Sequence, residues 1–140
     1  MPKHITNTPQ ETEALGAKLS SRLKAGDVVA LYGGLGMGKT AFVRGMAAGL
    51  GLDSTQVSSP TFALVNDYGG SPPLIHFDMY RISGWEDLYS TGFFDYMDAG
   101  TILAVEWSEN IENALPEHSI RVSFSRLSDN QREIDIDREL

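Results

Sequence analysis

The chain has 140 residues, of which 41% are hydrophobic and 21% charged, which is typical of one globular domain rather than a disordered chain. It has no cysteine and no apolar run near the roughly 18 residues of a membrane span, so we expect a cytoplasmic protein without disulfides, a secretory signal or a membrane segment. With a formal net charge of −8, the chain lacks the excess of basic residues that direct nucleic-acid binding requires.

The first third of the chain predicts a helix, a strand and a second helix. Thr8-Pro9-Gln10-Glu11 is a capping box with proline at the first helical position, and Gly26 supplies a stop. The helical spacing is carried by Ala14, Leu15, Leu19 and Leu23. Val28–Tyr32 reads as a buried strand, and a glycine-rich loop then leads into a helix that extends to about Leu50.

The rest of the chain predicts mostly strands. Residues 62–68 and 74–79 form two strands whose short link, residues 69–73, favours antiparallel pairing. A short helix is expected at 85–90, a strand at 101–107, a helix at 108–115 and a hairpin from strands 119–127 and 132–137. We therefore predict one α/β domain over residues 1–140, with a mixed parallel and antiparallel sheet flanked by helices.

The glycine-rich loop is the strongest functional signal. Residues 33–40, GGLGMGKT, satisfy the pattern G-x-x-x-x-G-K-[ST] and lie between a predicted strand and a predicted helix. Glycines let successive backbone N–H groups curl around a phosphate, and the helix N-terminus favours the same anion. Lys39 can reach the β- and γ-phosphates, and the Thr40 hydroxyl can bind Mg²⁺. The nucleotide-binding residues expected here are Gly33, Leu35, Gly36, Met37, Gly38, Lys39, Thr40 and Ala41.

A nucleotide site with Mg²⁺ needs a further acidic group, and the chain offers two candidates. Asp78 and Glu106 each follow a short apolar run, at the expected end of a buried strand. Their spacing does not rank them, so either can bind Mg²⁺ while the other orients water. His76 shares the strand face of Asp78, and we interpret it as a packed, hydrogen-bonded histidine.

Three further residues have two readings each. Thr61, in the segment Ser58–Phe62, is a candidate sensor of the γ-phosphate, or else part of a Ser-Pro turn that introduces a strand. Trp85 and Trp107 are read as core or interface anchors rather than base-stacking groups.

The charge is unevenly divided along the chain. Residues 1–65 carry six basic and four acidic residues, net +2, and residues 66–140 carry five and fifteen, net −10. The acidic half is either a solvated surface or a docking face for a basic protein partner.

Taken in order, the motifs resemble those of the TsaE family, bacterial ATPases that support threonylcarbamoyladenosine synthesis on tRNA. The P-loop itself is generic, and the specific part of the resemblance lies in the ordered combination that follows it. The matching segments are GGLGMGKT at 33–40, SPTF at 59–62, HFDMYR at 76–81, GFFDY at 92–96 and VEW at 105–107.

The resemblance implies a P-loop NTPase domain that binds ATP or ADP with Mg²⁺. Thr40 and Glu106 match the family's metal-site positions, Asp78 matches its Walker B-like aspartate, and Arg132 is expected near the nucleotide. The implied partners are the TsaB and TsaD proteins, and tRNA is contacted only through the complex with them. ATP hydrolysis is weak in the isolated protein and increases in this complex. Gly34 and Ala41 depart from the family's usual residues, an acid and a second threonine.

The resulting hypothesis assigns four catalytic residues. Lys39 neutralises phosphate charge, Glu106 holds Mg²⁺ together with Thr40, Asp78 positions a metal-bound water and Thr61 reports the γ-phosphate. One alternative is a small P-loop kinase that phosphorylates a metabolite or nucleoside. A GTPase-like switch is a second, although no guanine-reading N-K-x-D motif is present. A third is a protein for which nucleotide is only an assembly ligand.

Overall fold

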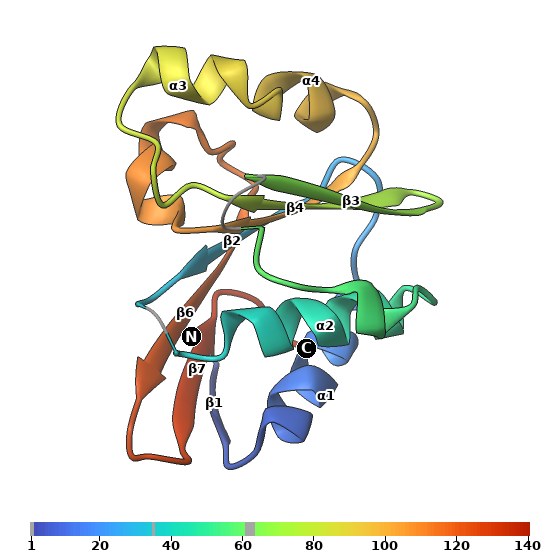
Figure 1. Ribbon diagram of the computed structural model, residues 1–140. Helices are drawn as coiled ribbons and strands as arrows, with labels where there is room; N and C mark the ends of the chain where they lie inside the picture. Colours follow the sequence, from blue (N-terminus) through green and yellow to red (C-terminus); the bar gives the residue numbers. More distant parts are fainter. Residues whose placement is uncertain (1, 35, 61–63) are drawn as a thin grey trace.

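The computed structural model describes residues 2–34, 36–60 and 64–140, which form one twisted seven-stranded sheet with helices on both faces (Figure 1). The strand order is β1-β7-β6-β2-β5-β4-β3. The strands are β1 (Lys3–Thr6), β2 (Val28–Tyr32), β3 (Val65–Gly70), β4 (Pro73–Asp78), β5 (Ile102–Glu106), β6 (Ile120–Arg126) and β7 (Arg132–Ile136). The four central strands, β6-β2-β5-β4, run parallel, while β3, β7 and β1 pair antiparallel with their neighbours. The predicted mixed α/β fold is confirmed.

Two pairs of helices cover the two faces of the sheet. The helices α1 (Pro9–Ser20) and α2 (Lys39–Gly49) pack on one face, and α3 (Trp85–Ser90) and α4 (Phe93–Asp98) lie over the other (Figure 1). Two 3₁₀ helices, η1 (Ser54–Gln56) and η2 (Ser108–Ala114), complete the described secondary structure. None of the helices in the described part of the chain combines the length and apolarity that a bilayer crossing requires.

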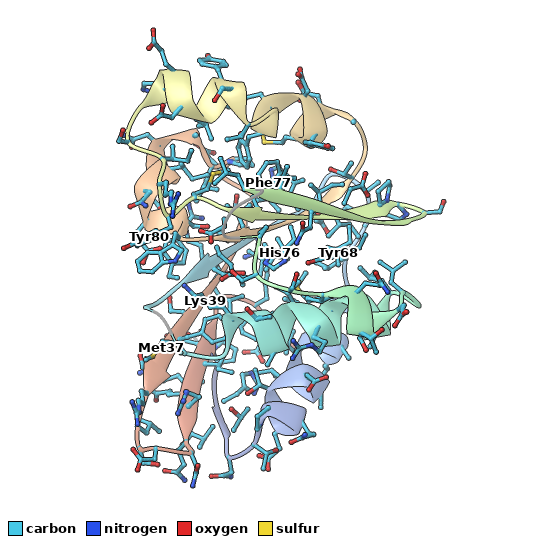
Figure 2. All side chains as sticks on the ribbon, in the orientation of Figure 1. Met37, Lys39, Tyr68, His76, Phe77 and Tyr80 are labelled. Atoms are coloured by element: carbon cyan, nitrogen blue, oxygen red, sulfur yellow. The ribbon has the colours of Figure 1, made fainter. Side chains whose placement is uncertain are left out.

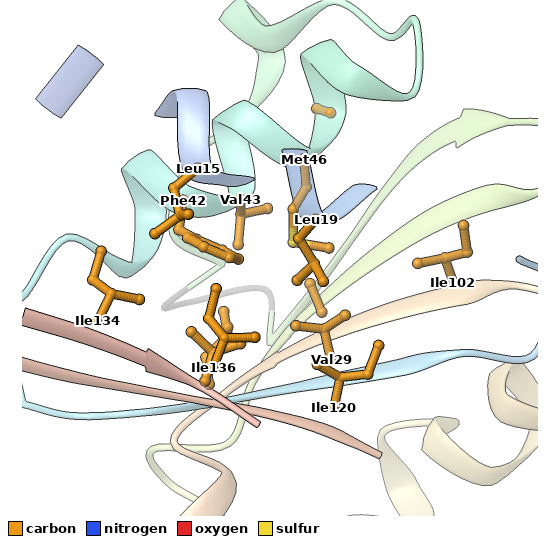
Figure 3. Packing of buried hydrophobic residues seen from close by; sticks show 14 of the residues in the cluster. Leu15, Leu19, Val29, Phe42, Val43, Met46, Ile102, Ile120, Ile134 and Ile136 are labelled. Atoms are coloured by element: carbon orange, nitrogen blue, oxygen red, sulfur yellow. The ribbon is translucent and has the colours of Figure 1, made fainter. Parts of the chain in front are cut away.

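The strands β2, β4 and β5 are buried on both faces, and their side chains alternate between two hydrophobic clusters. In β2, Val29 and Leu31 pack with α1 and α2, while Val28 and Ala30 point to the cluster under α3 and α4. Figure 3 shows the first cluster, where Phe42 and Met46 of α2 descend onto the strands. Because successive strand residues face opposite sides, this alternation also decides which face carries each polar residue of β4 and β5.

Small residues set the distance between α1 and α2. A Cβ atom at Gly45 would lie 1.8 Å from the carbonyl oxygen of Glu13, and one at Gly16 would lie 2.2 Å from that of Phe42. The two backbones therefore touch at these glycines, where no larger residue fits. This contact fixes α2, and with it the loop at its N-terminus, against α1.

Several predicted boundaries differ from those observed. The capping box is present, because the Thr8 hydroxyl accepts from the amide of Glu11 at 3.1 Å, but α1 ends at Ser20 rather than at Gly26. The element predicted as a helix at 108–115 is a 3₁₀ helix with a kink at Ile111. The strand predicted to begin at Phe62 begins at Val65 among the described residues.

Three short elements have no counterpart in the sequence predictions: β1, α4 and the 3₁₀ helix η1. Strand β1 has four residues and only one of them is buried, so its pattern is too short to detect. Helix α4 has six residues. Its start is marked only by the N-cap residue Gly92, whose φ of 81° interrupts the helical backbone between α3 and α4.

Candidate functional site

The glycine-rich loop lies where the parallel strands reach their carboxyl ends. It leaves β2 after Tyr32 and enters α2 at Lys39, the strand–loop–helix arrangement that the P-loop pattern requires. Gly38 is the N-cap of α2, with a φ of 96° that favours glycine and no side-chain cap. The first N–H groups of α2 are therefore left for another acceptor, at the end of the helix where the dipole is positive.

Lys39 is held inside this loop. Its side chain is only 5% exposed, and its Nζ donates to the carbonyl oxygen of Gly33 at 2.6 Å. The same ammonium lies 4.3 Å from the centre of the Trp107 ring, a cation–π contact. The lysine thus closes the loop onto itself, at the position where a phosphate group would compete for the same ammonium.

Burial lowers the pKa of Lys39 below the usual lysine value. The carboxylates of Glu106, Glu109 and Asp78 act in the opposite direction, because negative charge favours the ammonium form. The region around Lys39 therefore combines a buried cation with acidic neighbours, which is characteristic of a site where charge is redistributed on binding.

Asp78 and Glu106 lie side by side at the ends of neighbouring strands. They are register partners in the parallel pair β4 and β5, and both are almost completely buried. Leu74 of β4 and Ile102 of β5 are each separated from the acid on the same strand by an even number of positions, so they lie on the same side of the sheet as the acids. Both pack toward α1 and α2. Both carboxylates are therefore directed to the face of the sheet that carries α2.

The two acids differ in their immediate contacts. Asp78 accepts from the amide of Tyr80 at 2.9 Å, so it caps the turn that follows β4. Burial raises the pKa of Asp78, the hydrogen bond from Tyr80 opposes this, and the nearby Glu106 raises it further. Glu106 instead accepts from Nε2 of His76 at 2.5 Å.

A cavity of about 520 Å³ opens in front of the loop, a volume within the range of small-molecule sites. Its floor comes from the loop and the start of α2, and its outer wall comes from the β1–α1 connection and the β6–β7 turn. Glu106 lines the cavity. The other lining residues are Thr6, Asn7, Thr8, Pro9, Thr12, Gly36, Met37, Gly38, Lys39, Thr40, Ala41, Ser59, Asp129, Asn130 and Arg132.

The predicted nucleotide-site residues are thus largely brought together, with four exceptions. Gly33 lies behind the cavity wall, next to Lys39, and Asp78 lies next to Glu106 without lining the cavity. Leu35 and Thr61 lie outside the described residues. Arg132, expected near the nucleotide, donates from Nη2 to the carbonyl oxygen of Gly36 at 3.1 Å and so ties the terminal hairpin to the loop.

Trp107 adopts a left-handed backbone conformation, with a φ of 57°. Such a conformation costs a bulky residue about 1–2 kcal/mol and persists only where the surroundings enforce it. Here it turns the chain sharply out of β5, so that the indole packs over Lys39 and within 4.9 Å of the Tyr80 ring. Trp107 therefore contacts Lys39 in the candidate site, whereas Trp85 lies on α3 and is 53% exposed.

Two features of the site were missed in the sequence. Residues 6–9 supply part of the cavity wall because β1 pairs with β7, close to the opposite end of the chain. Glu109 accepts weakly from the amide of Gly33 at 3.4 Å, and lies in the 3₁₀ helix that follows Trp107. Only the second carried a sequence signal, an acid three residues after Glu106.

The donors at the cavity suit a hard cation held together with phosphate oxygens. Mg²⁺ prefers oxygen ligands, typically one or two carboxylates, and keeps phosphate groups and waters in its shell. The Thr40 hydroxyl and the Glu106 carboxylate both line the cavity next to the loop amides. No group of three or more His, Asp or Glu side chains suited to a metal occurs among residues 2–34, 36–60 and 64–140.

Comparison with known proteins gives consistent results. Residues 6–134 match the family described as "Threonylcarbamoyl adenosine biosynthesis protein TsaE". The chain is 36% identical over 132 residues to the tRNA threonylcarbamoyladenosine biosynthesis protein TsaE of Treponema pallidum, covering 94% of this chain and 97% of that protein. It is 38% identical over 133 residues to the Bacillus subtilis protein of the same name, covering 94% and 82%.

The fold also matches a solved structure. The crystal structure of Bacillus subtilis YdiB superposes with a TM-score of 0.78 and 34% identity, covering 96% of this chain and 83% of that one. Sequence and fold therefore identify the same group of relatives.

Proposed function

The chain belongs to the TsaE family of tRNA threonylcarbamoyladenosine biosynthesis proteins, and from this premise we propose that it is a Mg²⁺-dependent ATPase of that pathway. One observation carries the proposal. A buried lysine, free helix N–H groups and a buried carboxylate converge on one cavity at the carboxyl ends of parallel strands. Phosphoryl transfer needs this combination, because its catalysis consists mainly of positioning and charge stabilisation.

Each residue has a part in the proposed reaction. The loop amides and Lys39 bind the β- and γ-phosphates and stabilise the charge that develops on them. Thr40 and Glu106 would hold Mg²⁺, which would supply Lewis-acid neutralisation of phosphate charge. Asp78, beside Glu106 but off the cavity wall, would help to orient water at this site, and Thr61 would sense the γ-phosphate.

The cavity position supports the separate roles that the family resemblance implies for the two acids, which their spacing alone left unranked. Glu106 lines the cavity, and Asp78 instead caps the turn at Tyr80. We therefore assign the direct metal contact to Glu106 and a supporting role to Asp78. Arg132, bonded to Gly36 and lining the same cavity, is assigned to the outer part of the nucleotide.

We further propose that the protein works with the TsaB and TsaD proteins and meets tRNA only through them. The exposed aromatic side chains of α3 support a protein partner: Trp85 is 53% exposed, Tyr89 is 65% exposed, and both rings contact the half-buried Phe94 of α4. Residues 82–120 contain eight Asp or Glu and no Lys or Arg. An aromatic cluster within acidic surroundings suits a basic protein surface, because cations pack favourably on aromatic rings.

Calorimetry and phosphate release test the ATPase proposal. The protein should bind ATP in preference to GTP, and hydrolysis should need Mg²⁺ and rise when TsaB and TsaD are added. Glu106→Gln should keep ATP binding without metal and lose Mg²⁺-dependent hydrolysis, while Glu117→Gln, an exposed acid outside the cavity, serves as the matched control. Wild-type turnover in Glu106→Gln would contradict the metal assignment.

Two other outcomes would favour the alternatives. Transfer of phosphate from ATP to a nucleoside or small alcohol would indicate a kinase. A complex with TsaB and TsaD that forms with ADP and supports tRNA modification without ATP turnover would indicate that nucleotide is only an assembly ligand.

A further inference from the structure

A line of hydrogen-bonded groups, buried at Glu106 and His76 and half-buried at Tyr68, runs from the cavity to the segment that precedes β3. Glu106 accepts from Nε2 of His76 at 2.5 Å, and Nδ1 of His76 lies 2.9 Å from the hydroxyl of Tyr68. The Tyr68 hydroxyl donates to the carbonyl oxygen of Ser58 at 3.0 Å. Figure 2 shows Tyr68 and His76 side by side, between the sheet and the helix α2. Four side-chain or backbone groups from four parts of the chain are thus joined in sequence.

His76, in the middle of this line, is completely buried and hydrogen-bonded on both sides of its ring. His76 is 0% exposed, and both of its ring nitrogens have polar partners. A carboxylate can only accept, so Nε2 of His76 carries the proton that is shared with Glu106. The carboxylate of Glu106 is therefore held by a rigid ring that is itself completely buried.

The far end of the line reaches a segment that also borders the cavity. Besides donating to Ser58, the Tyr68 hydroxyl accepts from the amide of Ser58 at 3.3 Å. Asn66 also donates to the Ser58 carbonyl, at 3.2 Å. The next residue, Ser59, lines the cavity. The backbone of Ser58 is therefore connected, through the side chains of Tyr68 and His76, to the carboxylate on the cavity wall.

We propose that His76 is a positioning residue for Glu106, and that His76 and Tyr68 couple metal binding at this carboxylate to the backbone at Ser58. The inference rests on the proposed function, in which Glu106 would hold Mg²⁺. A hydrogen bond that orients a metal-binding side chain raises the affinity for the metal. Loss of the group that makes this bond typically lowers metal affinity about 10- to 100-fold. Coupling is reciprocal, so a metal bound at Glu106 also alters the segment that is tied to it.

The first test measures metal binding rather than turnover. ADP is titrated into the protein with Mg²⁺ and with EDTA, and the ratio of the two affinities gives the metal-dependent gain. His76→Gln, which keeps an N–H donor, and His76→Phe, which has none, are compared. We expect the gain to fall about 10-fold or more in His76→Phe and to be partly restored in His76→Gln, with ADP binding in EDTA unchanged. Equal losses with and without metal would show a purely structural role and overturn the proposal.

The second test measures the coupling and does not depend on the histidine variants folding. Tyr68→Phe removes one hydroxyl, and Tyr96→Phe, on the other face of the sheet, is the matched control. Hydrogen exchange at the Ser58 amide is followed with ADP in EDTA and with ADP and Mg²⁺. We expect Mg²⁺ to change this exchange in the wild type and in Tyr96→Phe, and the change to be lost in Tyr68→Phe.

The outcomes separate the two levels of inference. If the wild type shows no metal-dependent gain in ADP affinity, the proposed Mg²⁺ site itself is wrong. If the wild type shows the gain but the His76 variants keep it, or Tyr68→Phe keeps the exchange response, the positioning role or the coupling is wrong while the proposed function stands.

Discussion

Replacing Lys39 by methionine should weaken ATP binding by about 10- to 150-fold. The substitution keeps the length of the side chain and removes its charge. In the wild type the ammonium must first give up its 2.6 Å bond to the Gly33 carbonyl and then contact both the β- and γ-phosphates. The net gain is therefore about one charge-assisted hydrogen bond, roughly 1.5–3 kcal/mol, which corresponds to the stated loss at 1.4 kcal/mol per tenfold.

Titration calorimetry with ATP and with adenosine tests this reasoning. Adenosine has no phosphates, so its binding should be the same in both proteins. Lys18→Met, on the exposed side of α1, controls for the loss of a positive charge. Because burial disfavours the charged form of Lys39, the free energy of unfolding should not fall in Lys39→Met. ATP affinity within threefold of the wild type, or an equal loss for adenosine, would refute the phosphate assignment.

Three more predictions concern packing, partner binding and acid stability. Gly45→Ala should lower the free energy of unfolding by about 1–3 kcal/mol in urea titrations, because its Cβ would overlap the Glu13 carbonyl. Trp85→Ala should weaken binding to TsaB and TsaD by about 2 kcal/mol, some 30-fold by surface plasmon resonance, if this ring is an interface anchor. Folding lowers the pKa of Glu112 through its hydrogen bond from Tyr32, so its stabilisation is present at neutral pH and lost as the pH falls below about 4.5. Glu112→Gln should lose less stability between pH 7 and pH 3 than the wild type, by less than about 1 kcal/mol because the Glu112 side chain is half-exposed.

Each of these predictions has a control or a contrary result. At Gly84 a Cβ would meet nothing within 4 Å, so Gly84→Ala should leave stability nearly unchanged. Leu127→Ala removes a similarly exposed apolar side chain from the terminal hairpin and should leave TsaB and TsaD binding intact. Parallel acid profiles in the wild type and Glu112→Gln would show that the bond from Tyr32 adds nothing to folding.

The sequence predicts the inner half of the site well because that half is local. The P-loop residues are contiguous, and the backbone geometry they need is encoded in glycines such as Gly38. Asp78 and Glu106 could each be recognised at the end of an apolar run. Their adjacency follows from the pairing of β4 with β5, a contact between strands that a parallel sheet makes probable but that no local pattern specifies.

Apart from Arg132, which the family resemblance supplied, the outer half could not be predicted, because it depends on contacts between the two ends of the chain. Asn7 accepts from Gln131 at 2.9 Å across 124 positions, and this contact helps to join the β1–α1 connection to the terminal hairpin. The short β1 has too few buried residues to show a period. The line from Glu106 to Ser58 was equally hidden, since His76 alone reads as an ordinary buried histidine.

The strained turn at Trp107 gives the molecule a built-in optical signal. Indole fluorescence is sensitive to a nearby ammonium group, and the centre of the Trp107 ring lies 4.3 Å from the ammonium of Lys39, which a phosphate would draw away. The other tryptophan, Trp85, lies on α3 outside the cavity and supplies a steady background. Emission from the unlabelled protein should therefore change as the site fills, and occupancy can be followed in real time without a dye.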